Sequence, residues 1–141
     1  PGIGGLLRRL RCIPVQGSEA LDIATEVMAE GWSVAIMPEG RVVPESEWTA
    51  TGVGPARPGI GRLALTTGRP VVAVGVNGTE RFWPRGRNLP SITPWRRFPL
   101  TVRHEVLGIM EGDQPSVALE EIMAGITRCL NVPEDPSGLS D

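Results

Sequence analysis

Residues 32–38 read Trp-Ser-Val-Ala-Ile-Met-Pro, and this stretch decides the fold. The run is apolar at every position except Ser33, and Pro38 ends it, which predicts a buried strand. Residues 71–76, Val-Val-Ala-Val-Gly-Val, are a second run of the same kind and predict a second buried strand. Runs that are apolar on both faces are typical of a sheet covered by helices on both sides. The two stretches therefore predict an α/β domain.

Amphipathic helices are expected around these strands. Apolar residues recur at helical spacing in three segments, each of which ends near a glycine or a polar residue. The last segment has the most regular apolar stripe, and we expect that stripe to be buried. The segments are residues 18–30, 59–67 and 113–130, and the stripe consists of Leu119, Ile122, Met123, Ile126 and Leu130.

The segments between these elements complete the expected order. Residues 100–107 alternate apolar and polar side chains, which predicts a strand with one solvated face. Residues 12–15 are a short apolar run and a further candidate strand. Residues 41–58 and 80–99 are rich in proline and have no period, so we expect long loops. The order predicts a mixed, largely parallel sheet with helices on its faces.

Length and composition limit the class of protein. The chain has 141 residues, of which 40% are apolar and 21% charged, as in a globular domain. The net charge of −2 argues against a nucleic-acid-binding protein, which usually carries a strong basic excess. All 14 basic residues are Arg; a GC-rich genome explains that total, so only the placement of individual arginines can indicate phosphate binding. Cys12 and Cys129 lack the spacing of a disulfide framework or a zinc site.

Three separated blocks carry a more specific signal. Residues 34–41 read Val-Ala-Ile-Met-Pro-Glu-Gly-Arg, residues 57–64 read Arg-Pro-Gly-Ile-Gly-Arg-Leu-Ala, and residues 68–74 read Gly-Arg-Pro-Val-Val-Ala-Val. In this order, the blocks resemble the 1-acylglycerol-3-phosphate acyltransferase family of glycerophospholipid acyltransferases, over roughly residues 5–110. Pro-Glu-Gly alone would be an ordinary turn, and only the agreement of the three blocks makes the resemblance specific.

The resemblance implies a function and a site. The family moves an acyl group from a thioester of CoA or acyl carrier protein to a hydroxyl of a glycerol-phosphate lipid such as 1-acylglycerol-3-phosphate, in phospholipid biosynthesis. It implies no metal and no cofactor apart from the acyl donor itself. Its Pro-Glu-Gly block is thought to bind the acceptor. Carried over to this sequence, the acceptor- and phosphate-binding residues are Pro38, Glu39, Gly40, Arg41, Arg57 and Gly59, with Pro70 shaping the site.

These residue types suit that task. A carboxylate such as that of Glu39 can accept a hydrogen bond from a hydroxyl or an arginine, and Gly40 allows the backbone to approach a ligand closely. Arg41 and Arg57 present planar forks of donors that match a phosphate. We therefore expect one carboxylate and two guanidinium groups to converge on the phosphate of a lipid headgroup.

The sequence departs from the family pattern at several positions. Met37 replaces the usual Phe, Arg41 follows Gly40 directly, and Ala73 replaces the second Pro of the last block. A further family block, a strand that ends in Arg, aligns best with residues 12–17, where the Arg is absent.

The proposed base of the family, a His in an H-x-x-x-x-D motif, has no counterpart here. The single histidine, His104, follows the acceptor blocks and has Ile109 where the Asp is required. We expect His104 to be an ordinary strand residue. We also expect the base to lie upstream of Pro1, so that residues 1–132 are the C-terminal portion of an acyltransferase domain, an incomplete fold that is inactive alone, and residues 133–141 a polar tail. A degenerate family member is the other interpretation.

Further interpretations concern partners. Residues 59–64 fit the dinucleotide pattern G-x-G-x-x-A, but no strand directly precedes them, so we reject that site. Arginine and aromatic residues gather over residues 81–98, which fits a contact with membrane headgroups or a solvated loop. We expect a bacterial protein, cytoplasmic and peripheral on the inner face of the cell membrane, that binds an acyl donor and a lysophospholipid but no nucleic acid. The alternative is a non-catalytic α/β module for phosphorylated ligands or anionic membrane.

Overall fold

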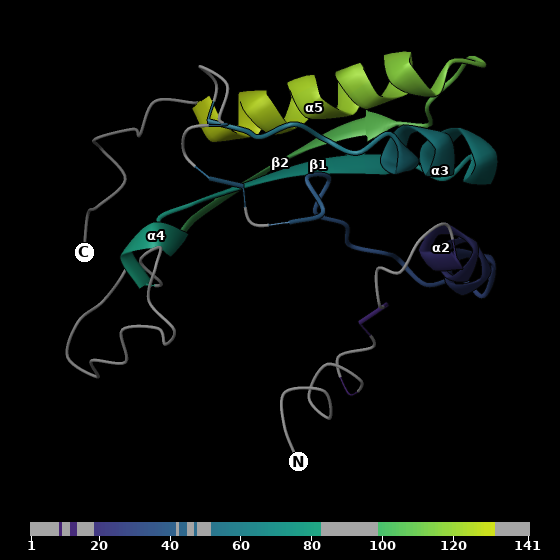
Figure 1. Cartoon of the computed structure of the whole chain (residues 1–141), viewed down its shortest axis with the longest axis horizontal. Helices are drawn as coiled ribbons and strands as arrows, with labels where there is room; N and C mark the ends of the chain where they lie inside the picture. Colours follow the sequence, from purple (N-terminus) through teal and green to yellow (C-terminus); the bar gives the residue numbers. More distant parts are fainter. Residues whose placement is uncertain are drawn as a thin grey trace.

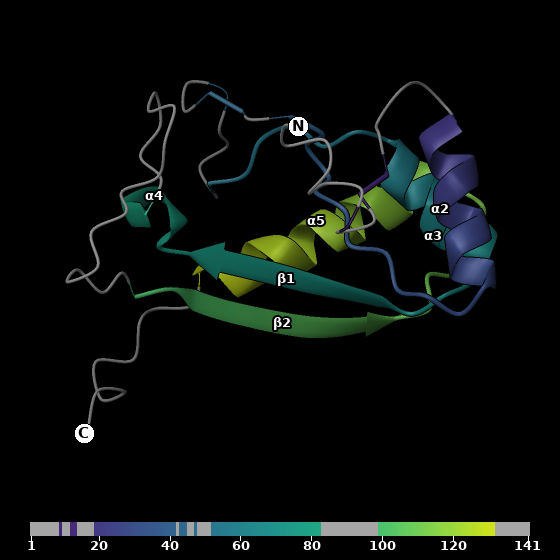
Figure 2. The same ribbon diagram turned by 90° about the horizontal axis from the view of Figure 1, so that it is seen from below.

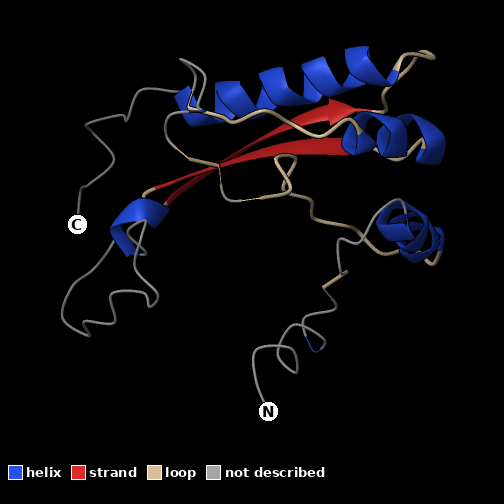
Figure 3. Ribbon diagram, viewed as in Figure 1, coloured by secondary structure: helices blue, strands red, loops and turns tan. Residues whose placement is uncertain are grey.

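A computed structural model gives the architecture (Figure 1). It describes residues 9, 12–13, 19–41, 43–44, 47, 52–82 and 99–131. Figure 3 distinguishes the helices from the strands. In chain order the elements are α2 (Glu19–Ala29), α3 (Gly59–Thr67), β1 (Val71–Asn77), α4 (Thr79–Phe82), β2 (Thr101–Gly108) and α5 (Pro115–Asn131). The helices predicted over residues 18–30, 59–67 and 113–130 and the strands predicted over residues 71–76 and 100–107 are thus confirmed.

The sheet differs from the predicted one. β1 and β2 pair antiparallel, with Val72 opposite Val106 and Val74 opposite His104. Within the described residues the sheet consists of these two strands, so the prediction of a largely parallel sheet is wrong for this part of the chain. The register places Thr101, at the start of β2, opposite Asn77, at the end of β1, so the two strands are antiparallel neighbours that need no crossover helix.

Helix α5 covers one face of the sheet (Figures 1 and 2). The approach is close because small residues line it: a Cβ atom added to Gly75 would lie 2.8 Å from the backbone carbon of Cys129, and one added to Gly125 would lie 3.1 Å from the Cβ atom of Ala73. The predicted stripe is correct at Ile122, which is 1% exposed, but Leu119 and Met123 are only half-buried. The other buried positions of α5 are Ala118, Gly125 and Cys129.

The opposite face of the sheet is exposed in the described part of the chain. It carries the outward side chains of both strands, which apart from His104 are apolar and 42–68% exposed. Its valines are Val72, Val74, Val76, Val102 and Val106. Helices on both faces of the sheet were predicted, and among the described elements none buries this second face.

The predicted buried strand over residues 32–37 is wrong. These residues have no strand conformation, Trp32 is 53% exposed, and Met37 is 86% exposed. A strand needs a hydrogen-bonded neighbour, and neither β1 nor β2 pairs with this segment. Cys12 and Ile13, the described part of the other candidate strand, also lie outside any strand.

Two of the predicted irregular segments lie largely or entirely outside the described residues. The loop expected over residues 80–99 begins as the short helix α4, and residues 83–98 lie outside the described residues. The polar tail at 133–141 lies outside them as well. Within the part of the chain that the structure describes, no helix combines the length and apolarity that crossing a bilayer requires.

An ion pair joins α5 to the sheet. The Nε and Nη2 atoms of Arg128 donate to the two carboxylate oxygens of Glu105 at 2.9 and 2.8 Å. The side chains are 54% and 38% exposed, so the pair contributes little to stability. The hydrogen bond from Arg128 lowers the pKa of the Glu105 carboxyl below its usual value.

We predict that this pair weakens in acid. Because the pKa of Glu105 is lower in the folded state, its stabilisation is present above the unfolded-state pKa and is lost as the pH falls through the folded-state pKa. Arg128→Gln should therefore show a slightly smaller drop in thermal unfolding midpoint between about pH 7 and about pH 3 than the unsubstituted chain. Glu111→Gln, which removes an exposed carboxylate that forms no ion pair with another described residue, should leave the drop unchanged. An identical drop in the Arg128 variant would contradict the prediction.

Candidate functional site

Two segments that the sequence singled out lie side by side in the structure. The Arg57 N–H donates to the Pro38 carbonyl at 2.9 Å. The Gly54 N–H donates to Oε1 of Glu39 at 2.6 Å. We call this arrangement of residues 38–40 and 54–57 the loop junction. The junction joins the Pro-Glu-Gly block to the start of the next block across a proline-rich loop.

Gly40 shapes the junction through its backbone. Its N–H donates to the Met37 carbonyl at 3.0 Å, which closes a turn, and its φ of 65° is in the left-handed region that favours glycine. A Cβ atom added to Gly40 would lie 2.9 Å from Nε and 3.0 Å from Cδ of Arg57. The missing side chain therefore leaves the space that the Arg57 side chain occupies.

The guanidinium of Arg57 is available to a ligand. The residue is exposed, and among the described residues no carboxylate forms an ion pair with it. A positive group that is fixed along its stem and open at its tip is suited to an anion such as a phosphate.

Arg41 is engaged differently. Its Nη1 atom donates to Oε1 of Glu47 at 3.3 Å, and its Nη2 atom forms an ion pair with Oε2 of the same carboxylate. This hydrogen bond raises the pKa of Arg41, and the charge of Glu39 adds a smaller effect in the same direction. The structure thus brings Glu39, Gly40 and Arg57 together, while the Arg41 guanidinium is bound to Glu47. Binding of a ligand by any of these residues stays a prediction.

The last two predicted site residues lie apart from this contact. Gly59 is the first residue of α3, and its closest neighbour is the side chain of Leu21 on α2, 3.3 Å from an added Cβ atom. Pro70 follows α3, so the nine residues of that helix, on the order of 13 Å of rise, separate it from Arg57. Any effect of Pro70 on the junction would be indirect.

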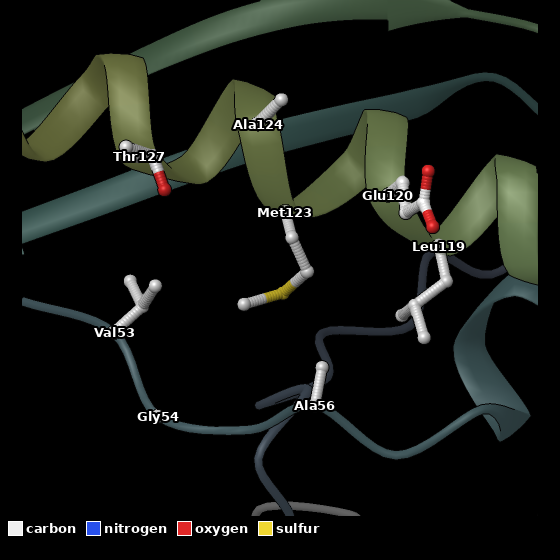
Figure 4. A pocket seen from close by; sticks show the side chains of 8 residues that line it. All are labelled: Val53, Gly54, Ala56, Leu119, Glu120, Met123, Ala124 and Thr127. Carbon is white, nitrogen blue, oxygen red and sulfur yellow. The ribbon is translucent and has the colours of Figure 1, made fainter. Parts of the chain in front are cut away.

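An apolar hollow of about 480 Å³ lies beside the junction, between residues 53–56 and α5 (Figure 4). Gly54 both lines the hollow and donates to Glu39. Two of its lining residues, Leu119 and Met123, were predicted to lie in the buried stripe of α5. Both are only half-buried, because their side chains face this hollow. The lining residues are Val53, Gly54, Ala56, Leu119, Glu120, Met123, Ala124 and Thr127.

The comparison with protein families decides what kind of protein carries this junction. A family model described as Acyltransferase matches residues 1–77, more than half of the chain. The chain belongs to the Acyltransferase family. The match contains α2, α3, β1 and both segments of the loop junction, whereas β2 and α5 lie beyond it. Neither a curated protein nor a solved structure matches this acyltransferase.

Membership of the family confirms the acyltransferase resemblance and indicates acyl transfer as the general chemistry. In this acyltransferase His104 lies in the middle of β2, opposite Val74 and on the exposed face of the sheet. The expectation that it is a strand residue is confirmed. Since His104 is the single histidine of the chain, no imidazole lies at the loop junction among the described residues.

Proposed function

We propose that this acyltransferase uses a glycerol-phosphate lipid such as 1-acylglycerol-3-phosphate as its acceptor, and that Arg57 binds the phosphate. The observation that carries the proposal is the exposed Arg57 guanidinium, whose stem is held against Gly40 and which has no ion-pair partner among the described residues. The donor is the thioester of acyl-CoA or of acyl carrier protein. Such a reaction belongs to phospholipid biosynthesis.

The chemistry divides between two tasks. The hydroxyl oxygen of the acceptor attacks the thioester carbonyl carbon, the C–S bond breaks, and the hydroxyl proton passes through a base to the thiolate that leaves. The described residues at the loop junction offer a carboxylate and a guanidinium but no imidazole. Their task in the proposal is therefore to bind and orient the acceptor, which brings its hydroxyl within reach of the thioester.

The apolar hollow supports a lipid acceptor over a free glycerol phosphate. The hollow is wide open to solvent, and its lining by Leu119, Met123 and Val53 suits one side of an aliphatic chain. Because the proposed substrate is a membrane lipid, we propose that the protein acts at the inner face of a bacterial cell membrane.

The test compares two ligands that differ in the phosphate. Isothermal titration should show that 1-hexanoylglycerol 3-phosphate binds at least about tenfold more tightly than uncharged 1-hexanoylglycerol, since a charge-assisted contact contributes roughly 1.5 kcal/mol or more. Equal affinities for the two ligands would refute phosphate recognition.

We predict that Gly40→Ala weakens binding of the phosphate ligand by about tenfold. The new Cβ atom would meet Nε and Cδ of Arg57 and push the guanidinium from its position. Gly52→Ala is the matched control because Gly52 also has a positive φ, 80°, but an added Cβ atom there meets nothing within 4 Å. Both variants carry the backbone strain, and only the first should lose affinity in the same titration. Equal losses would assign the effect to strain alone.

A further inference from the structure

The loop junction has one contact whose purpose the binding of phosphate does not explain. Oε1 of Glu39 accepts the Gly54 N–H at 2.6 Å, a charge-assisted hydrogen bond that spans 15 residues of chain. A carboxylate that contacts a backbone amide in the free protein already has a partner. Its contact fixes the backbone of the neighbouring loop.

The loop that Glu39 holds is the loop that carries Arg57. The Gly54 amide lies three residues before Arg57, and the Arg57 amide donates to the carbonyl of Pro38, the residue before Glu39. The two bonds together tie both ends of residues 54–57 to the Pro-Glu-Gly turn. The side chain of Arg57 then passes over Gly40, the next residue of the same turn.

The side chain of Val43 also packs closely against the loop at Gly54. An added Cβ atom at Gly54 would lie 2.6 Å from Cγ1 of Val43, which is 2% exposed. Gly54 is itself buried, and the Glu39 carboxylate accepts the hydrogen bond from its amide. An unmet backbone donor in such a place is costly, which makes the carboxylate of Glu39 its required acceptor.

We infer that Glu39 is a positioning residue: its carboxylate holds residues 54–57 so that Arg57 presents its guanidinium to the acceptor phosphate, and it does not contact the acceptor itself. The inference rests on the proposed function only in naming Arg57 as the phosphate ligand. Pro-Glu-Gly is then a backbone clamp in which each residue has one task. The carbonyl of Pro38 and the carboxylate of Glu39 hold the loop, and Gly40 leaves room for the arginine.

The experiment separates the acceptor capacity of Glu39 from its charge. Glu39→Gln keeps an oxygen that can accept the Gly54 N–H, and Glu39→Ala removes it. Amide hydrogen exchange at Arg57 is the informative reporter, because the acceptor of that amide, the Pro38 carbonyl, is present in both variants. Glu39→Ala should speed this exchange by about tenfold or more, Glu39→Gln by about threefold or less, and exchange at Ala73 in the core should stay unchanged. The control Glu111→Ala should leave the Arg57 amide unaffected.

Affinity for glycerol 3-phosphate gives the second readout. Glu39→Ala should lose about tenfold in affinity, Glu39→Gln should retain affinity within about threefold, and Glu39→Ala combined with Arg57→Ala should bind no more weakly than Arg57→Ala alone. Additive losses in the double variant, or a Glu39→Gln variant as weak as Glu39→Ala, would show that Glu39 contacts the ligand and would overturn the inference.

The failure of the inference and that of the proposed function can be told apart. If Arg57→Ala loses affinity but Glu39→Ala changes neither exchange nor affinity, the inference falls and phosphate binding by Arg57 stands. If Glu39→Ala frees the Arg57 amide but Arg57→Ala binds glycerol 3-phosphate normally, the clamp exists but does not serve phosphate binding. That outcome overturns both the stated role of Glu39 and the proposed function.

Discussion

Arg57→Ala should lower the affinity for glycerol 3-phosphate by about 10- to 100-fold, the largest loss of binding we expect from any single side chain. A hydrogen bond to a charged group contributes roughly 1.5–3 kcal/mol, and each ~1.4 kcal/mol corresponds to a factor of ten. The group is not already paired among the described residues, so its whole interaction is available to the ligand. Isothermal titration at one fixed salt concentration measures the change, because screening alters every phosphate contact.

Three further variants identify the cause of that loss. Arg57→Lys keeps the charge but not the planar fork, so its affinity should lie between those of the unsubstituted chain and the alanine variant. Arg62→Ala removes the same charge from an exposed position on α3 and should change affinity by less than about twofold. Arg41→Ala should cost less than about threefold, since Glu47 already binds that guanidinium. A loss at Arg62 equal to the loss at Arg57 would indicate a general effect of net charge.

The sequence predicted the elements whose signal is local. α5 and β2 follow from the spacing of apolar residues within each segment, which depends on the helical and strand periods alone. The prediction of a strand over residues 32–37 was wrong because a strand also requires a hydrogen-bonded partner. The apolar run contains no information on whether such a partner is present. The prediction of a largely parallel sheet was wrong for the same reason, because an apolar run does not identify the strand with which it pairs.

The residues of the loop junction could be predicted from the sequence only in part. The family resemblance grouped Glu39, Gly40 and Arg57, and the structure does bring them together. The role of Gly54 could not be predicted, because the group it contributes is a backbone N–H that every residue except proline possesses. Arg41 looked equivalent to Arg57 in sequence, and only the position of Glu47 distinguishes them.

The hollow beside α5 was not predicted, because α5 has two apolar faces, one against the sheet and one toward residues 53–56. Small residues on α5, such as Gly125 and Cys129, meet β1 most closely, which turns Leu119 and Met123 toward residues 53–56. A stripe of large apolar side chains does not reveal that smaller residues beside it make the tightest contact. The pattern of glycines therefore carries as much information on the packing of this protein as the pattern of leucines.

Gly61→Val should be the most destabilising single substitution, because Gly61 lies where α3 crosses the start of α5. An added Cβ atom would lie 2.0 Å from the Pro115 carbonyl oxygen and 3.0 Å from the Leu119 nitrogen, both backbone atoms that no rotamer change can move. The helices must separate, which opens the core cluster around Ile122 and Ala64. Overpacking of this kind costs about 3 kcal/mol or more, well above the ~1 kcal/mol that replacing a helical glycine gains. Thermal unfolding should show a midpoint lowered by roughly 10 °C, or no cooperative transition.

Gly59→Ala, two residues earlier on α3, is the matched control. Its added Cβ atom would meet only the side chain of Leu21, with Cδ1 at 3.3 Å and Cδ2 at 3.4 Å, the end of a flexible side chain that can shift. Its midpoint should stay within about 3 °C of the unsubstituted chain, and Gly61→Ala should fall between the two. A Gly61→Val variant that unfolds at the same temperature as Gly59→Ala would mean that α3 and α5 do not approach each other this closely in solution. In that case the packing that orients the start of α3, and with it the loop bearing Arg57, would have to be reconsidered.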